Sequence, residues 1–166
     1  MPDPLEDPRL TLVGLLAEVF TGMEAEGAGQ LAEHGLANAE FEVLIRLARS
    51  PHRRLRMTHL AAQTSLTTSG ITRVVDRLVA RGLVSREACP DDRRSTYAVI
   101  TASGLDRLEA VLPQHLDLID RWLVAPLDDE QLRALESALR TVRDAVRPDA
   151  TAGAVEQIPE PTAPTR

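Results

Sequence analysis

The sequence predicts a mainly α-helical protein with a minor β component (a small α+β contribution). Apolar residues recur at helical spacing over about 9–33, 37–49, 102–124 and 128–147. Between the second and third of these runs lie two short helical segments and two alternating segments, the pattern of an antiparallel hairpin. With two phenylalanines, one tyrosine and one tryptophan, the core must be aliphatic, which suits interlocked helices.

The N-terminal region should be an arm followed by a helix. Residues 1–8 contain three prolines and three acidic residues, and we expect a flexible arm there. Residues 9–36 form the first helical unit, in which glycines near 27–29 predict a break or bend and His34-Gly35-Leu36 predicts the end. Its apolar stripe consists of Leu12, Leu15, Leu16, Val19, Phe20 and Met23.

Residues 37–101 are predicted to form a second unit. A helix at 37–49, a turn at 50–54 and a possible strand at 55–57 lead to a short helix at 59–64, which Thr58 can cap. Three or four residues later a second helix begins, at about 67–81, and this is the spacing of a helix-turn-helix. Gly82 can adopt a left-handed cap after it. The apolar stripe of this helix consists of Ile71, Val74, Val75, Leu78 and Val79.

The polar side of the 67–81 helix indicates its function. Ser69, Thr72, Arg73 and Asp76 face away from the apolar stripe, and the set is completed by Thr68 at the N-terminal end and Arg77 on the flank. Arginine can pair with guanine in the major groove, and hydroxyls can contact bases or phosphates. We therefore interpret this helix as a DNA-recognition helix.

A hairpin follows directly, at about 83–100. Residues 83–87 and 97–100 alternate as half-buried strands, and 89–95 form the loop between them. The adjacent Arg93 and Arg94 at its tip suit the minor groove, whose negative potential attracts guanidinium groups. Residues 37–101 are therefore predicted to be a winged helix-turn-helix lobe.

The C-terminal region should contain two long helices, within 102–147. Pro113 is expected to bend the first, Pro126 to break it, and Asp128 with Gln131 to begin the second with a capping box. Residues 148–166 are expected to be a disordered tail. The stripes of these helices and of 9–36 exceed what one lobe can cover, so they predict a homodimer; the alternative is that these helices pack only on their own domain. A two-fold dimer would place two recognition helices about 34 Å apart on a palindromic operator.

Charge is distributed unevenly along the chain. Between Pro51 and Thr101 nine arginines face four acidic residues, a segment charge of +5 in a chain of net charge −6. A basic middle on an acidic body favours binding of double-stranded DNA through the middle alone. Lysine is absent from the chain, which reflects either the bidentate contacts of arginine or genome composition.

Other classes of function are disfavoured. No apolar run reaches the roughly 20 residues that cross a bilayer, and the acidic N-terminus is unlike a secretion signal, so we expect a cytoplasmic protein without membrane contact. Its single cysteine, Cys89, suits that reducing compartment. The four histidines have no metal-ligand spacing, and no nucleophile–base pattern or glycine-rich phosphate loop is present. We expect no metal, no cofactor and no enzymatic activity.

The motifs together resemble the MarR-type winged helix-turn-helix repressors. The run Leu66–Leu78, followed by Arg81-Gly82-Leu83-Val84 and Arg86, resembles their recognition helix and first wing strand. Asp92-Arg93-Arg94, and later Ile100–Gly104, are similar to their wing and wing-to-helix junction. Cys89-Pro90 resembles a subgroup common in high-GC bacteria. The resemblance covers about residues 9–147 and departs from the family in the predicted break of the first helix.

The resemblance implies a dimeric regulator of a nearby promoter. It implies release from DNA when a small phenolic, aromatic or carboxylated ligand binds between the dimer and DNA-binding lobes. Arg94 would enter the minor groove, oriented by Asp92. The matching major-groove residues are Thr68, Ser69, Thr72 and Arg73; the matching phosphate contacts are Arg53, Arg54, Ser65, Thr67 and Arg77.

Some assignments stay open at this point. Phe20, Met23, Met57 and His59 are candidate ligand contacts, as is Trp122, although apolar residues at helical spacing are more often core. Arg73 and Arg94 could each be a solvated charge or form a local pair with Asp76 or Asp92, and Asp92 could be only a turn former. The alternatives for the whole protein are a winged-helix protein-interaction module or a redox-responsive regulator acting through Cys89. The ligand, the operator and the choice between repressor and activator are not encoded in any motif.

Overall fold

The structure is a computed structural model that describes residues 3–90, 92 and 95–151. A 3₁₀ helix (Pro4–Glu6) precedes α1 (Pro8–Glu33). The middle of the chain contains α2 (Asn38–Ala48), a 3₁₀ turn (Pro51–Arg53), β1 (Arg54–Arg56), α3 (Met57–Gln63), α4 (Thr68–Ala80), β2 (Val84–Ala88) and β3 (Thr96–Ile100). The last elements are α5 (Ala102–Ile119), a π-helical turn (Asp120–Val124), α6 (Asp129–Val146) and a 3₁₀ helix (Pro148–Thr151).

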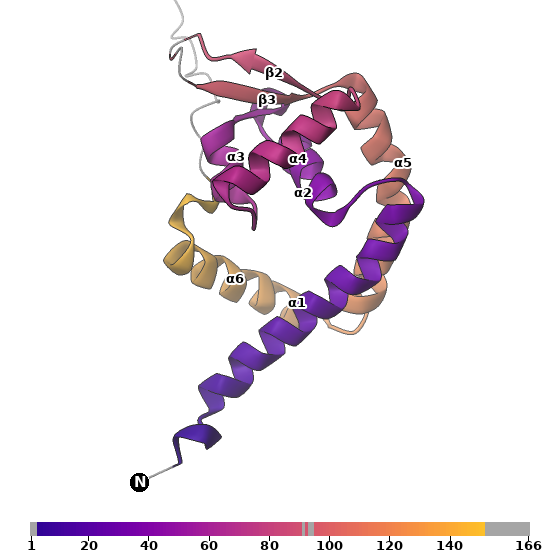
Figure 1. The fold of residues 1–166 in the computed structure, drawn as a ribbon. Helices are drawn as coiled ribbons and strands as arrows, with labels where there is room; N and C mark the ends of the chain where they lie inside the picture. Colours follow the sequence, from indigo (N-terminus) through magenta and orange to yellow (C-terminus); the bar gives the residue numbers. More distant parts are fainter. Residues whose placement is uncertain (1–2, 91, 93–94, 152–166) are drawn as a thin grey trace, which may run out of the picture.

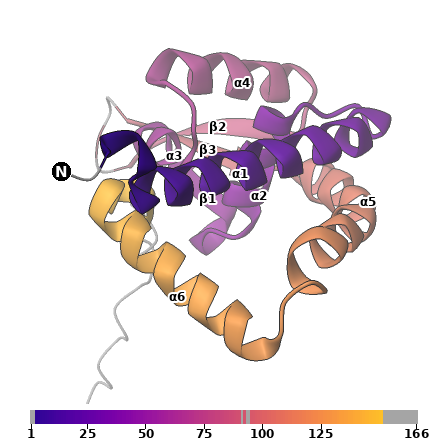
Figure 2. The same ribbon diagram turned by 90° about the horizontal axis from the view of Figure 1, so that it is seen from below.

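The elements form two lobes, which Figure 1 shows one above the other. The winged lobe comprises α2, α3, α4 and an antiparallel sheet of order β1-β3-β2. The helical lobe comprises α1, α5 and α6; in Figure 2, which is seen from below, α5 and α6 curve round one edge and α1 crosses in front of the winged lobe. The predicted mainly α-helical fold with a small antiparallel sheet is confirmed. In that sheet β1 pairs with β3 rather than standing alone, so that Leu55 lies opposite Ala98.

One aliphatic core joins the two lobes. Leu44, Leu60, Ile71 and Leu78 bring α2, α3 and α4 together, each at most 1 % exposed. The same cluster includes Leu31 of α1 and the α5 residues Leu108 and Val111. The C-terminal end of α1 and the first half of α5 are therefore fixed to the winged lobe through this cluster, to which α6 contributes no buried residue.

The predicted break in the first helix is wrong, because α1 runs unbroken from Pro8 to Glu33. Gly27 is buried within it. A Cβ atom built there would lie 3.7 Å from Cε1 of His115, an ordinary van der Waals distance, so α1 lies against α5 at this glycine. The cost of glycine in a helix, about 1 kcal/mol relative to alanine, therefore does not break α1 here.

The helix-turn-helix begins earlier than predicted. α3 begins at Met57 directly after β1, so Thr58 lies inside the helix and is not its cap. The predicted start of α4 is confirmed: the Thr67 hydroxyl accepts a hydrogen bond from the Gly70 amide at 3.1 Å. Gly82 follows α4 with a φ of +70°, the left-handed conformation expected of it.

Replacing Thr67 with alanine should lower the free energy of unfolding by about 1 kcal/mol, because the first turn of α4 loses its capping acceptor. Thermal or urea unfolding measures this change. Thr141→Ala is the matched control, since the Thr141 hydroxyl only donates to the Ser137 carbonyl four residues earlier in α6. Equal destabilisation by both substitutions would contradict the capping role.

The C-terminal helices differ from the prediction in two details. The first ends in a π-helical turn rather than an ordinary α-helical one. The expected tail from 148 onward begins with the 3₁₀ helix Pro148–Thr151, which packs against α3; residues 152–166 lie outside the described part of the chain. The capping box of α6 is confirmed, with Asp128 Oδ1 accepting from the Gln131 amide at 2.8 Å and Gln131 Oε1 from the Asp128 amide at 3.0 Å.

Large apolar side chains remain exposed on the helical lobe. In α1, the exposed fraction of Leu12, Val19 and Phe20 is between 53 % and 62 %. In α6, the exposed fraction of Val142 and Val146 is 52 % and 69 %. These residues belong to the apolar stripes identified in the sequence, so a single chain leaves both stripes uncovered. Among the described helices, none is long and apolar enough to cross a membrane.

Candidate nucleic-acid interface

The outer face of α4 is polar and open to solvent. Ile71, Val74, Val75 and Leu78 turn inward and are buried, which leaves the opposite side chains exposed. The residues on this open face are Thr68, Ser69, Thr72, Arg73, Asp76 and Arg77. The buried stripe therefore fixes the rotation of the helix, and α4 presents the side that the sequence predicted.

Arg73 differs from Asp76 and Arg77 in having no ion-pair partner among the described residues. The only carboxylate near it on this face of α4, Asp76, accepts a hydrogen bond from Arg86 Nη2 of β2 at 2.8 Å. Within the part of the chain that the structure describes, Arg73 forms no ion pair. The local pairing of Arg73 with Asp76, considered from the sequence, is therefore absent, and the guanidinium group is available to a partner.

Arg77 is held by an acid that sequence reasoning missed. The buried carboxylate of Glu40, at the start of α2, accepts from Arg77 Nε at 3.3 Å and from Arg81 Nη1 at 2.9 Å. It also accepts from the Ala37 amide at 3.2 Å. Buried carboxylates need such partners, so Arg77 and Arg81 fasten α4 to α2. Nothing in the local sequence marks this contact, because 37 residues separate Glu40 from Arg77.

The other predicted phosphate contacts lie in different surroundings. Arg53 is exposed, at a φ of +56°. Arg54 lies 3.7 Å from Glu87 and stacks 4.6 Å from the centre of the Tyr97 ring, so it belongs to the sheet surface. The Ser65 hydroxyl donates to Glu42 at 3.1 Å, and Thr67 caps α4. Arg54, Ser65 and Thr67 therefore each have an internal contact that would compete with phosphate. Among the described residues, Arg53 has no such contact.

The tip of the wing is described only in part. Asp92 Oδ2 accepts from the Ser95 hydroxyl at 2.6 Å, and the Asp92 carbonyl accepts from the Ser95 amide at 2.9 Å, which closes the loop as a turn. Arg93 and Arg94, the predicted minor-groove residues, lie outside the described residues, so the orienting role of Asp92 stays a prediction. Cys89 is buried at 2 % exposure, which disfavours it as a redox sensor, since such thiols are accessible.

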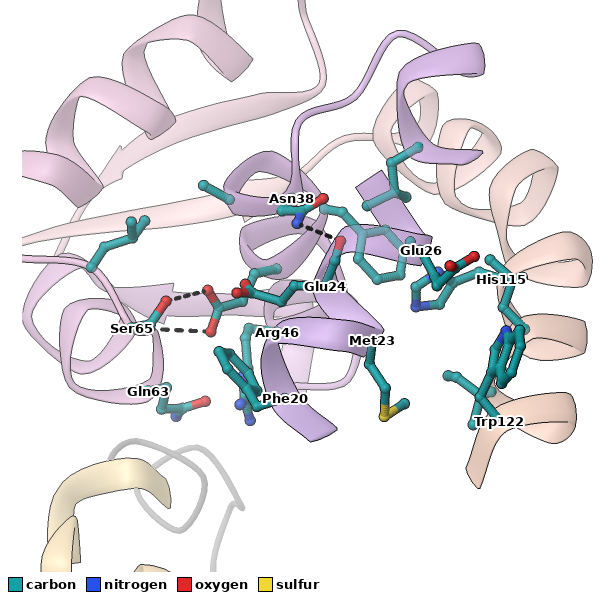
Figure 3. Close-up of a pocket in the computed structure, with 18 of the residues that line it drawn as sticks. Phe20, Met23, Glu24, Glu26, Asn38, Arg46, Gln63, Ser65, His115 and Trp122 are labelled. Atoms are coloured by element: carbon teal, nitrogen blue, oxygen red, sulfur yellow. Dashed lines mark hydrogen bonds between the residues drawn. The ribbon is translucent and has the colours of Figure 1, made fainter. Parts of the chain in front are cut away.

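An interlobe cleft of about 670 Å³ lies between the winged and helical lobes. Phe20, Met23 and Trp122 of the helical lobe and Phe41 of α2 give it apolar walls, and Arg46 and Arg147 are also among its lining residues. Figure 3 shows Phe20, Met23 and Trp122 turned toward it. Its volume and lining are typical of a small-molecule site.

The structure does not gather all four predicted ligand residues there. Phe20 and Met23 line the interlobe cleft, but Met57 and His59 do not. Met57 packs against the core and borders a smaller hollow between α3, α4 and the wing. The four residues therefore do not form one site. The sequence could not show this, because periodicity gives the inner face of each helix but not which helices meet.

A polar pair in the cleft wall, buried Gln30 and partly buried His115, was also not predicted from the sequence. Nδ1 of His115 lies 3.3 Å from Oε1 of Gln30, and the exposed fraction of residue Gln30 is only 6 %. Burial lowers the pKa of the His115 imidazole, because the charged ring loses hydration. The lowered pKa favours the neutral form of the ring. No group of three or more histidine, cysteine, aspartate or glutamate side chains suited to a metal occurs among the described residues.

The architecture and the exposed face of α4 define the chain as a winged helix-turn-helix protein. Comparison with known proteins agrees. A family model described as the MarR family matches residues 34–95. Sco3205 of Streptomyces coelicolor, a MarR family transcriptional regulator solved in complex with DNA, is 32 % identical and superposes with a TM-score of 0.79 over 89 % of this chain and 93 % of its own.

Two regulators of Bacillus subtilis are also similar. The transcriptional regulator MhqR is 29 % identical over 83 % of this chain and 93 % of its own length, and the transcriptional repressor YetL is 33 % identical over 60 % of each. The chain belongs to the MarR family. The resemblance noted in the sequence is thereby confirmed, and the family consists of transcriptional regulators rather than enzymes.

Proposed function

We propose that the protein is a homodimeric, sequence-specific repressor that binds a palindromic operator in double-stranded DNA and leaves it when a small effector occupies the interlobe cleft. The observation that carries the DNA-binding part is the exposed α4 face, on which Arg73 has no ion-pair partner within the described part of the chain. Thr68, Ser69 and Thr72 share that face and supply short hydrogen-bonding groups at the depth of the bases. The DNA complex of Sco3205 and the repressor YetL support the same reading.

The apolar faces of α1 and α6 support the dimer. They lie on the helical lobe, away from α4, so a second copy that covers them leaves both recognition helices open (Figure 1). The two-fold symmetry of such a pair would match two half-sites about one turn of DNA apart. In this proposal Arg94 and Arg53 add minor-groove and phosphate contacts, and Phe20 and Met23 contact the effector.

Titration of the full chain with the DNA upstream of its own gene tests the proposal. We expect a discrete protected site, and an affinity that falls steeply with salt because each phosphate contact releases counterions. Genomic fragments of random sequence serve as the control and should bind more weakly at moderate salt. If the chain selects no fragment above that background, the winged lobe is instead a protein-interaction module.

A further inference from the structure

The hydrogen-bond network in the wall of the interlobe cleft fixes the chemistry of His115. The side-chain nitrogen of Gln30 donates to the Val111 carbonyl at 3.3 Å. A carbonyl oxygen can only accept, so the atom facing Val111 must be the amide nitrogen and the amide oxygen must face His115. That oxygen lies 3.3 Å from Nδ1 of His115. Because Oε1 also can only accept, Nδ1 must carry the hydrogen.

This assignment leaves Nε2 of the neutral ring with a free lone pair. His115 lines the interlobe cleft, and among the described residues none is hydrogen-bonded to its Nε2. Phe41 packs against the ring with centroids 4.4 Å apart, which fixes the ring plane. Figure 3 shows His115 on the same wall as Trp122, beside Glu26. Burial lowers the pKa of the imidazole and so favours the neutral ring, in which Nε2 is unprotonated.

We propose that His115 is a specificity-determining residue of the cleft, whose Nε2 accepts a hydrogen bond from a hydroxyl or N–H group on an apolar ring compound. Gln30 is the positioning residue that holds the ring in the required tautomer. The inference rests on the proposed effector role of the cleft, and it adds that the ligand is the donor and His115 the acceptor of the hydrogen bond. Glu24, Glu26 and Glu42 line the same cleft, and their charges disfavour a ligand carboxylate beside His115. Arg46 and Arg147, which also line the cleft, would attract a ligand carboxylate to their own positions.

A matched pair of probes tests the inference without DNA. 4-tert-Butylphenol carries the donor, and 4-tert-butylanisole has the same ring with the donor methylated. Calorimetric titration of the full chain should show the phenol binding about three- to tenfold more tightly, the effect of one hydrogen bond. Fluorescence of Trp122, the single tryptophan, gives a second readout at the cleft itself.

His115→Phe keeps a ring against Phe41 but removes the acceptor, so the ratio of the two affinities should fall to about one. Gln30→Met should reduce the ratio of the two affinities, because the ring would no longer be held in the tautomer that carries its hydrogen on Nδ1. His34→Phe is the control, because His34 contacts Gln114 and is absent from the cleft lining; it should keep the wild-type ratio. Thermal unfolding of each variant shows that it is folded.

Equal binding of phenol and anisole by the wild type, no binding of either, or a preference that persists in His115→Phe would each overturn the inference. Operator binding is measured separately and without probe. A chain that ignores DNA but keeps the phenol preference would refute the proposed function and leave the role of His115 standing.

Discussion

Replacement of Arg73 with alanine is expected to weaken operator binding by about 1–3 kcal/mol, roughly 5- to 150-fold. Arg73 projects from the exposed face of α4 without an ion pair among the described residues, so its guanidinium group enters a complex without first losing a partner. Since a bidentate contact to one base carries sequence information, preference at one base pair per half-site should relax. Fluorescence anisotropy with the operator and with single-base variants measures both effects.

Arg140→Ala is the matched control for Arg73→Ala. It removes the same charge from α6, where Arg140 bonds only to Glu136 one turn earlier in the described structure, and it should change operator affinity little at constant salt. If Arg73→Ala bound as tightly and as selectively as the parent chain, α4 would not be the element that recognises bases.

Replacement of Val19 with glutamate should convert the protein to a monomer. Val19 is 53 % exposed in one chain, in the middle of the apolar stripe of α1. In a two-fold dimer the substitution would bury one unpaired carboxylate per chain, and each costs several kcal/mol. Sedimentation or light scattering at micromolar concentration measures the mass, and operator affinity should fall more than for Arg73→Ala because the two half-sites are no longer bound together.

Thr21→Glu introduces the same charge on the opposite side of α1, where the Thr21 hydroxyl bonds only within the helix. This variant should stay dimeric and bind DNA. If Val19→Glu has the same mass as Thr21→Glu, the exposed faces of α1 and α6 are not covered by a second copy.

Local sequence patterns predicted the elements that hydrophobic periodicity and capping determine. The bounds of α4 follow from its apolar stripe, from the Thr67 hydroxyl and from Gly82, all of which act within a few residues. The capping box at Asp128 was predictable for the same reason. By contrast, the helical propensity of Gly27 predicted a break in α1, because propensity cannot reveal that α5 lies against this glycine.

The candidate site was predictable on the α4 face but not in the cleft. Residues that face solvent from one helix can be identified from that helix alone, as Arg73 was. The network of Gln30 and His115 joins positions 85 residues apart, and the carboxylate that holds Arg77 lies in α2. A single sequence contains no signal for such pairs. For the same reason, the sequence grouped Met57 and His59 with Phe20, although only Phe20 of the three lines the interlobe cleft.

The fastening of Arg147 sets a limit on how the lobes can move. Nη2 of Arg147, just after α6, donates to the carbonyls of Ala62 and Thr64 at 2.9 and 2.6 Å, at the end of α3. The segment from α5 to α6 therefore leaves the winged lobe at Thr101 and contacts it again at Arg147, so it is attached to that lobe at both ends. In the proposed dimer, a shift of α6 along its partner would pull directly on the turn before α4. The dimer interface between the two α5–α6 segments would therefore govern the separation of the two recognition helices, and hence the operator spacing that they fit.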